Sequence, residues 1–163
     1  MSERTLVLLR HAKSDWSGGE TDRLRPLAER GRRQAPDAGR WLAAHLDHID
    51  LAVVSPARRA RDTWGLVAAE LDTPPPTRID DRVYAASGPE LLGIVCELSD
   101  DLDTSVLVGH NPGIEDLASL LSGETPRMPT SALAVLAIPG SWSAAGDRSA
   151  TLRAAGRRPT LPE

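Results

Sequence analysis

Runs of consecutive apolar residues alternate along this chain with segments in which apolar residues recur every three or four positions. The first run, Thr5–Leu9, has no polar residue after the threonine, which is typical of a short strand buried on both faces. Similar runs at Leu51–Val54 and Thr104–Val108 predict two more buried strands, and Thr77–Ile79 predicts a short one. Residues 131–138 and 149–154 predict a final pair of strands around a turn at Pro139-Gly140.

Helices are predicted between these strands, over residues 32–46, 57–71, 89–98 and 114–121. The second carries Ala60, Trp64 and Val67 at helical spacing, which predicts one buried face. Pro36 is unfavourable inside a helix, so the first helix is expected either to start near this residue or to bend there.

This alternation predicts an α/β fold, namely a three-layer α/β/α sandwich whose sheet is mostly parallel. The last two strands would add an antiparallel edge. With 163 residues and 40 % hydrophobic content, the chain has the size of one domain, which we expect over residues 1–155. Residues 156–163, rich in proline and arginine, are predicted to form a flexible C-terminal tail.

Composition and charge argue against several classes of protein, namely membrane, nucleic-acid-binding and disulfide-bonded proteins. It has no apolar run of 18 residues or more and begins with no basic-then-apolar leader, so we expect a cytoplasmic protein with no membrane partner. A net charge of −4 gives no support for nucleic-acid binding. The single cysteine, Cys96, excludes an intramolecular disulfide and is expected to be a small core residue. No apolar surface stripe is evident, so we expect a monomer.

A small group of titratable residues at the end of the first helix raises the question of a metal site. His45 and His48 lie close in sequence to Asp47 and Asp50. The group spans a helix–loop boundary and has no partner motif elsewhere, so we favour solvated surface histidines over a metal site. No metal and no cofactor is expected.

Histidines and arginines follow the ends of three predicted strands. The first strand ends at Arg10-His11, and the strand ending at Val108 is followed closely by His110-Asn111. The strand at Leu51–Val54 leads through Ser55-Pro56 into a helix that begins with three arginines, at positions 58, 59 and 61. Because the carboxyl ends of parallel strands meet at one edge of a sheet, these groups are expected to converge on one crevice. Imidazole and guanidinium groups there suit an anion such as phosphate.

Three segments carry a resemblance to a known family. Arg10-His11-Ala12 resembles the R-H-G signature of the histidine phosphatase superfamily, which has the phosphoglycerate-mutase-like fold. The segment Ser55-Pro-Ala-Arg-Arg-Ala-Arg-Asp-Thr63 resembles the family's S-P-x-x-R-A-x-x-T motif, and Val108-Gly-His-Asn-Pro112 resembles the motif with its second histidine. The longer run R-H-A-K-S-D-W and the segment Arg25-Pro26-Leu27 resemble the branch of SixA-type phosphohistidine phosphatases.

The resemblance implies a role for each matching residue. His11 would be the nucleophile and form a phosphohistidine intermediate, while Arg10, Arg59 and His110 would hold the phosphoryl oxygens. The family spacing from Ser55 points to Arg59 as the catalytic arginine, with the adjacent Arg58 facing solvent. Arg25 matches an extra arginine of the SixA branch and would bind substrate in the same pocket.

Two further positions have open interpretations. Asn111 would line the pocket and bind substrate, although capping of the following helix would explain it equally well. The general acid that many superfamily members use has no clear match. Among the carboxylates of the matching region, Asp81 is the predicted general acid, and a solvated loop carboxylate is the alternative reading.

The resemblance implies a metal-independent phosphatase whose partner is a phosphorylated substrate, with a histidine-phosphorylated protein as the favoured one. The first alternative keeps the chemistry and changes the substrate to a small phosphomonoester. The second is a phosphate-binding module without turnover. A phosphohistidine substrate makes less demand on a general acid, because a protonated imidazole leaves readily.

Overall fold

The chain forms one six-stranded sheet in a computed structural model that describes residues 3–162. The strand order is β3-β2-β4-β1-β5-β6. The strands are β1 (Glu3–Arg10), β2 (Leu51–Val54), β3 (Thr77–Ile79), β4 (Thr104–Gly109), β5 (Leu133–Pro139) and β6 (Thr151–Gly156). Strands β1 to β4 are parallel to their neighbours among themselves, whereas β5 and β6 pair antiparallel. The predicted parallel sheet with an antiparallel edge is confirmed.

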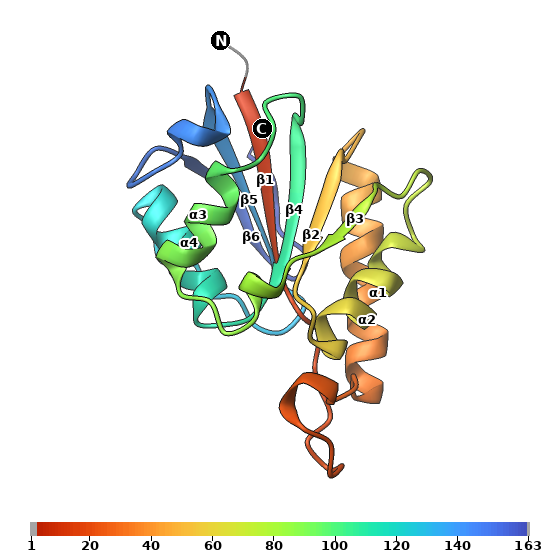
Figure 1. The fold of residues 1–163 in the computed structure, drawn as a ribbon. Helices are drawn as coiled ribbons and strands as arrows, with labels where there is room; N and C mark the ends of the chain where they lie inside the picture. Colours follow the sequence, from red (N-terminus) through yellow and green to blue (C-terminus); the bar gives the residue numbers. More distant parts are fainter. Residues whose placement is uncertain (1–2, 163) are drawn as a thin grey trace.

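Helices cover both faces of this sheet, which makes the three-layer sandwich (Figure 1). Helices α1 (Glu29–His45) and α2 (Arg58–Ala68) pack on one face, and α3 (Gly88–Cys96) and α4 (Gly113–Ser122) pack on the other. Short 3-10 turns η1 (Asp22–Leu24), η2 (Asp81–Val83) and η3 (Trp142–Ala144) lie in the connections. In β1, alternate side chains enter opposite layers: Leu6 and Leu8 pack under α3 and α4, and Val7 and Leu9 under α1 and α2.

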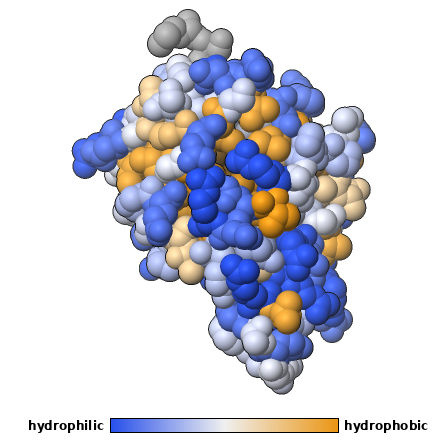
Figure 2. All heavy atoms as spheres, viewed as in Figure 1, coloured by the Kyte–Doolittle hydropathy of each residue, from blue (hydrophilic) through white to orange (hydrophobic). Residues whose placement is uncertain are grey.

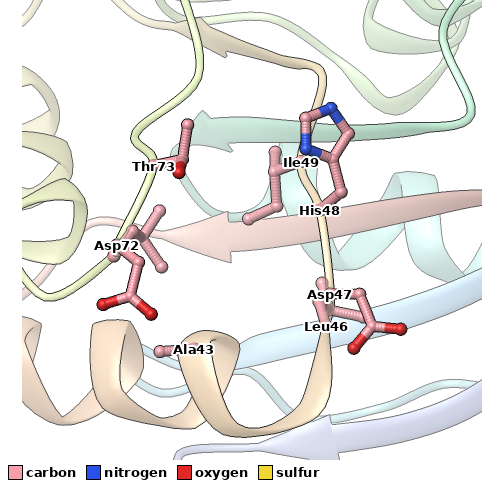
Figure 3. Close-up of a pocket in the computed structure, with 8 residues that line it drawn as sticks. Ala43, Leu46, Asp47, His48, Ile49, Asp72 and Thr73 are labelled. Carbon is pink, nitrogen blue, oxygen red and sulfur yellow. The ribbon is translucent and has the colours of Figure 1, made fainter.

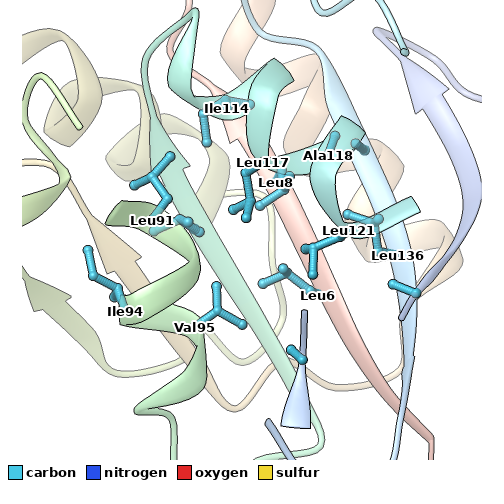
Figure 4. Close-up of a cluster of buried hydrophobic side chains, with 14 of the residues drawn as sticks. Leu6, Leu8, Leu91, Ile94, Val95, Ile114, Leu117, Ala118, Leu121 and Leu136 are labelled. Atoms are coloured by element: carbon cyan, nitrogen blue, oxygen red, sulfur yellow. The ribbon is translucent and has the colours of Figure 1, made fainter. Parts of the chain in front are cut away.

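The layer beneath α3 and α4 is built almost wholly from aliphatic side chains. Figure 4 shows Leu91 and Ile94 of α3 and Leu117 and Leu121 of α4 pointing toward the strands. Each fully buried leucine contributes roughly 1.5–3 kcal/mol relative to an exposed one, so this layer is a major source of stability. Cys96 is partly buried against the margin of the same cluster, as a small apolar residue would be.

The observed helix limits correct one expectation about α1. The helix begins at Glu29, so Pro36 lies well inside it, and the prediction that the helix starts near Pro36 is wrong. The apolar and small residues that face the sheet extend α1 toward its N-terminus: Gly31 and Ala35 are buried there. The sheet packing of this whole face outweighs the unfavourable proline.

The segment between β1 and α1 projects below the sheet as a long loop (Figure 1). Its two arms are joined by a bridge between Ser14 and Leu27, and the Ala28 N–H donates to the Lys13 carbonyl at 2.9 Å. A Cβ atom on Gly31 would lie 2.1 Å from the Lys13 carbonyl oxygen, so only glycine permits this approach of helix and loop. The loop thereby carries η1 toward the carboxyl ends of the strands.

The C-terminal segment runs along the α1 side of the molecule. The Trp41 Nε1–H donates to the Pro159 carbonyl at 2.8 Å, and Leu161 packs against the apolar cluster of this side. Glu163 lies outside the described residues, and the flexibility of residues 156–163 stays a prediction. Within residues 3–162, no helix has the length and apolar character needed to cross a membrane.

Candidate active site

The carboxyl ends of β1, β4 and β2 lie side by side at one edge of the sheet. Strand β4 lies between β1 and β2. Arg10 of β1 is aligned with Gly109 of β4, and Val54 of β2 is aligned with Val108 of β4. Backbone bonds continue this alignment one residue further: the His11 N–H donates to the Gly109 carbonyl and the Ser55 N–H to the Val108 carbonyl, both at 3.1 Å. The convergence of three strand ends, expected from the sequence, is therefore present.

Two imidazoles face each other at this edge. The ring centroids of His11 and His110 are 5.1 Å apart, with the rings tilted by 55°. The guanidinium groups of Arg10 and Arg59 are close enough for their charge to lower the pKa of both histidines. Four of the predicted site residues are thus brought together.

The backbone fixes which nitrogen of His11 is available. Nδ1 lies 2.8 Å from the Ala12 carbonyl oxygen, which can only accept a hydrogen bond. Nδ1 therefore carries the proton, and the lone pair of the neutral ring is on Nε2. The Ala12 N–H in turn donates to Thr63 Oγ1 at 2.9 Å, and that hydroxyl donates to the Arg59 carbonyl at 2.6 Å. Helix α2 thus positions both the arginine and the loop that orients His11.

Ser55 determines the tautomer of His110. His110 Nε2 lies 2.7 Å from Ser55 Oγ, and the same oxygen accepts the Ala57 N–H at 3.2 Å. This buried hydroxyl has no other acceptor for its hydrogen within residues 3–162, so it donates to Nε2, which leaves the proton of the neutral ring on Nδ1. Nδ1 is buried and has no partner within residues 3–162, so it is the ring nitrogen of His110 that can donate to a ligand.

Burial keeps both imidazoles neutral at pH 7. It is the largest cause that lowers the pKa of His11 to about 3 and that of His110 to about 4. The Ala12 carbonyl opposes this for His11 by stabilising its protonated form, but the positive charges nearby act in the same direction as burial. A neutral His11 retains the Nε2 lone pair that a nucleophile requires.

Asp22, which the sequence analysis did not single out, connects the arginines of the site. Arg59 donates to the Asp22 backbone carbonyl at 2.7 Å and to its Oδ2 at 3.1 Å. Arg25 donates from Nε to Asp22 Oδ1 at 3.1 Å, and the Tyr84 hydroxyl donates to Oδ2. The tyrosine bond and the two arginines lower the pKa of Asp22 to about 2, so its carboxylate is charged at neutral pH. The only sequence signal for this residue is its position three residues before Arg25.

Arg25 is held from three sides at the base of the projecting loop. Besides its contact with Asp22, it donates to Ser14 Oγ at 2.6 Å, and its guanidinium lies 3.3 Å from the centroid of the Trp16 ring. The residue is 7 % exposed, although it belongs to a loop. Because a planar guanidinium held in this way loses little further freedom on binding an anion, Arg25 is prepared to contact one.

Asn111 is engaged by its own chain. Its side-chain nitrogen donates to Glu115 Oε2 at 2.6 Å and to the Met128 carbonyl at 3.0 Å, and its oxygen accepts the Glu115 N–H at 3.3 Å. The Met128 carbonyl also accepts from Arg10 Nη1 at 3.1 Å. These contacts favour the capping interpretation of Asn111, which ties the start of α4 to the loop that supports Arg10.

Asp81, the predicted general acid, lies in η2, and two other carboxylates of the region, Asp80 and Glu90, lie beside η2 and in α3. Asp80 pairs with Arg82 at 2.8 Å, and Glu90 forms a capping box with Ser87 at the start of α3. Asp81 is exposed, and no hydrogen bond within residues 3–162 joins its side chain to either site histidine. The carboxylate that does reach the arginines is that of Asp22.

Three buried N–H donors of this site have no acceptor within residues 3–162. They are Arg10 Nε, Arg59 Nε and His110 Nδ1. Buried donors are nearly always paired in folded proteins, and unpaired ones mark places where a ligand or water supplies the acceptor. All three belong to residues that surround His11, so this edge of the sheet offers a set of donors for an oxyanion.

Another pocket, drawn in Figure 3, lies at the other end of the strands, near the amino ends of β2 and β3. It is formed by the residues just before β2 and β3, including His48, Asp47 and Thr73. His48 Nε2 lies 2.7 Å from Asp50 Oδ1, and the histidine side chain is 66 % exposed. No arginine lines this pocket, so it lacks the cationic donors found at the other edge.

Comparison with known proteins agrees with this geometry. Residues 6–84 match the family described as the histidine phosphatase superfamily (branch 1). An uncharacterized protein of Mycobacterium tuberculosis (strain ATCC 25618 / H37Rv) is 36 % identical over 146 residues, which cover 83 % of this chain and 90 % of that protein.

Solved structures share the fold along almost the whole chain. A protein assigned as the phosphohistidine phosphatase SixA of Nakamurella multipartitia superposes with a TM-score of 0.84 and 30 % identity, covering 95 % of this chain and 96 % of that one. The protein histidine phosphatase SixA solved with tungstate superposes with a TM-score of 0.81 at 22 % identity, covering 93 % and 96 %. At the latter identity the likeness concerns the fold alone.

Proposed function

This chain belongs to the histidine phosphatase superfamily, and from that premise we propose that it is a metal-independent phosphatase whose substrate is protein phosphohistidine. The observation that carries the proposal is the free Nε2 of a neutral His11 beside buried, unpaired donors of Arg10, Arg59 and His110. These residues offer a nucleophile and the positive charge that a phosphoryl group needs in the transition state. We propose that the protein acts in the cytoplasm, a reducing compartment in which its single cysteine would stay a free thiol.

In the first step, the Nε2 lone pair of His11 attacks the phosphorus atom. A new N–P bond forms on His11 while the N–P bond of the substrate breaks, and the substrate imidazole leaves with the electron pair of that bond. The substrate ring leaves as neutral imidazole because its other nitrogen carries a proton. Arg10, Arg59 and the Nδ1–H of His110 bind the phosphoryl oxygens throughout, and Arg25 contacts the same group.

In the second step, water attacks the phosphoryl group on His11. The N–P bond of His11 breaks, the ring recovers its Nε2 lone pair, and the water proton goes to solvent with inorganic phosphate as product. Because the Ala12 carbonyl keeps a proton on Nδ1, phosphorylated His11 is positively charged and leaves as a neutral ring. The same hydrogen bond therefore prepares His11 both to attack and to leave.

The charge state of Asp22 supports phosphohistidine over a phosphate ester. An alcohol leaving group needs a proton from a general acid, whereas an imidazole with an ordinary pKa of about 6.5 needs little assistance. Asp22 is hydrogen-bonded to Arg59 and Arg25, and with a pKa of about 2 it has no proton to give at neutral pH. A site with a charged carboxylate in this place suits the substrate with the better leaving group.

Rapid-quench labelling tests the proposal. A phosphotransfer protein carrying 32P on its histidine is mixed with this protein, and the reaction is stopped at millisecond to second times. We expect transient label on this chain, located on His11 by mass spectrometry, that decays to free phosphate. The His11→Ala variant serves as control and should acquire no label.

Two outcomes would overturn the proposal in different ways. Hydrolysis of a small aryl phosphate without label from the phosphohistidine protein would point to the small-molecule phosphomonoesterase. No label and no hydrolysis, together with binding of inorganic phosphate, would point to a binding module without turnover.

A further inference from the structure

Helix α2 has a second patterned face that the catalytic residues do not use. One face, with Arg59, Thr63 and Val67, is buried toward the sheet and the site. The other repeats at the same helical spacing along the groove side and consists of Arg58, Arg61, Asp62, Gly65 and Leu66. On this second face Arg58, Arg61 and Gly65 are exposed, so they are accessible to a ligand.

This second face forms one wall of an open groove of about 370 Å³. The opposite wall is made by Pro26 and Leu27 at the end of the projecting loop and by Arg32 at the start of α1. Figure 2 shows strongly hydrophilic residues gathered on this side of the molecule, where the projecting loop joins the body. We call this the α1–α2 groove.

The α1–α2 groove adjoins the candidate active site on both of its walls. Arg58 is next to Arg59 in the sequence, and Pro26 is next to Arg25, so each wall of the groove contains the immediate neighbour of a site residue. Consecutive Cα atoms are about 3.8 Å apart, so a chain segment that leaves the site can enter the groove within a few residues.

The charge in the groove is positive although the whole chain has a net charge of −4. Three arginines and one aspartate line it. Arg58 pairs with Asp62 at 3.3 Å and Arg32 donates to the Leu27 carbonyl at 2.9 Å, whereas Arg61 makes no ion pair within residues 3–162. The groove therefore has an excess of two positive charges and attracts an acidic ligand.

The α2 wall of the groove is open at Gly65. A Cβ atom added to Gly65 would meet nothing within 4 Å, so the glycine leaves space above the helix. Leu27 and Leu66 lie on either side of the groove. This arrangement has room for an aliphatic side chain between flanking acidic residues.

We propose that the α1–α2 groove binds an acidic segment of the substrate protein, adjacent in sequence to its phosphorylated histidine. Glutamate or aspartate side chains of that segment would pair with Arg58 and Arg61, and an aliphatic side chain would lie over Gly65. The inference rests on the proposed function and extends it, since it names what the enzyme recognises beyond the phosphoryl group.

Three phosphohistidine substrates test this. Two are synthetic peptides of equal length with a central histidine phosphorylated by phosphoramidate, one flanked by glutamate and leucine, the other by lysine and leucine. The third is free phosphohistidine. We expect the wild-type KM to be lowest for the glutamate peptide, and this preference should weaken as salt screens the charges.

The charge of the groove is tested with one groove variant and one control variant. The double variant Arg58→Glu/Arg61→Glu should raise KM for the glutamate peptide about tenfold, since two attractive surface pairs become repulsive, and leave free phosphohistidine unaffected. Acidic residues suit the first turn of a helix, so α2 should keep its fold. Arg153→Glu, on the edge strand β6, is the control for a single charge reversal outside the groove and should behave as wild type.

Filling the groove provides an uncharged test. Gly65→Leu should raise KM for the glutamate peptide, whereas Gly65→Ala should leave most of the space and the wild-type KM. Equal KM values for the two peptides, or a preference that survives the double variant, would overturn the inference while leaving the phosphohistidine activity in place.

A binding experiment distinguishes failure of the groove inference from failure of the proposed function. If none of the three substrates is hydrolysed, the proposed function is wrong, and fluorescence anisotropy of the labelled, unphosphorylated glutamate peptide decides about the groove. Saturable binding that is lost in both groove variants supports an acidic ligand for the groove. Absence of binding to the wild type overturns it.

Discussion

The four histidines of this chain fall into two pairs at opposite edges of one sheet. His11 and His110 lie beyond the carboxyl ends of β1 and β4, are buried, and have arginines around them. His45 and His48 lie before β2. Nδ1 of His45 is 2.8 Å from a backbone carbonyl, and Nε2 of His48 is 2.7 Å from Asp50, with the latter side chain mostly exposed.

The difference between the pairs lies in their surroundings and not in residue type. At one edge, a ring nitrogen is fixed by the backbone or a buried serine, so the remaining nitrogen faces the site in a defined state. At the other edge, His45 also has a backbone partner, but the rings of His45 and His48 are exposed, so solvent competes for their hydrogen bonds. A reactive histidine therefore needs burial, a fixed tautomer and neighbouring cations together.

The largest difference between the two pairs is expected when one histidine of each is replaced by alanine. His11→Ala should lower phosphatase activity by at least about 10⁴-fold, as loss of a covalent nucleophile does in other enzymes. His48→Ala should leave activity unchanged. Steady-state rates on a phosphohistidine peptide measure both. Retention of full activity in His11→Ala would show that another residue carries the phosphoryl group.

Much of this architecture follows from patterns that the sequence displays. Continuous apolar runs give β1, β2 and β4, and each is followed at once by the residues that converge at the site. The carboxyl ends of parallel strands meet at the same edge, so Arg10, His11, His110 and the arginines that begin α2 could be expected together from the sequence pattern. The choice of Arg59 among these arginines came from the resemblance to the family motif.

Asp22 and Ser55 show where such reasoning stops. Asp22 lies in a loop without periodicity, and its contact with Arg59 spans 37 residues, so only the path of the chain reveals it. Ser55 was recognised as part of a motif, but its bond to Nε2 of His110 depends on the register of β2 against β4. The projecting loop and its glycine contact are likewise tertiary properties that no local pattern encodes.

Ser55→Ala should have the next largest effect. Without the hydroxyl, His110 Nε2 loses its partner, and the proton is no longer held on Nδ1. We expect kcat to fall roughly 10- to 100-fold, by analogy with the loss of hydrogen-bond partners that orient metal-binding histidines. ¹⁵N NMR of the His110 ring should show a changed tautomer population, and Ser55→Thr should restore both tautomer and rate. A normal rate in Ser55→Ala would contradict this role.

Asp22→Asn tests two opposing effects of the Asp22 carboxylate, namely orientation of the arginines and repulsion of the phosphoryl group. The carboxylate orients Arg59 and Arg25 through charged hydrogen bonds, yet its negative charge also opposes a phosphoryl group. The neutral amide should therefore lower kcat about tenfold, the equivalent of one weakened charged bond, and lower KM as well. Leu24→Ala, in the same turn and exposed, is the control. A rise in KM would contradict this balance of effects.

Acid should act on the buried pair through its lowered pKa values. Folding lowers the pKa of His11 to about 3 and of His110 to about 4, below the ordinary value near 6.5. Between pH 6.5 and 4 the unfolded chain binds more protons than the folded one, so the free energy of unfolding decreases as pH falls. Denaturant unfolding at pH 7.5 and 5 measures this.

The decrease should be smaller in His110→Asn than in the wild type, because one of the contributing groups is gone. His48→Ala should retain the full decrease. In NMR titrations, the ring signals of His11 and His110 should stay constant from pH 7.5 to 5. A midpoint near 6.5 for either ring would show that burial does not keep it neutral.

The smallest effect on activity, and a clear one on stability, is expected where α1 meets the projecting loop. Gly31→Ala would place Cβ 2.1 Å from the Lys13 carbonyl oxygen, so helix and loop must separate, at a cost of roughly 1–3 kcal/mol. Gly93→Ala in α3 is the matched control, since nothing lies within 4 Å of its Cβ, and alanine should stabilise the helix by up to about 1 kcal/mol.

Opposite signs for these two glycine substitutions would show that the loop is held by close backbone contact with α1. That contact fixes one end of the segment that carries Asp22 and Arg25, so Gly31→Ala should also lower kcat a few-fold, whereas Gly93→Ala should not. Urea unfolding and initial rates of both variants measure the two effects. If Gly31→Ala is stable and fully active, the loop adapts freely, and the placement of Asp22 does not depend on α1.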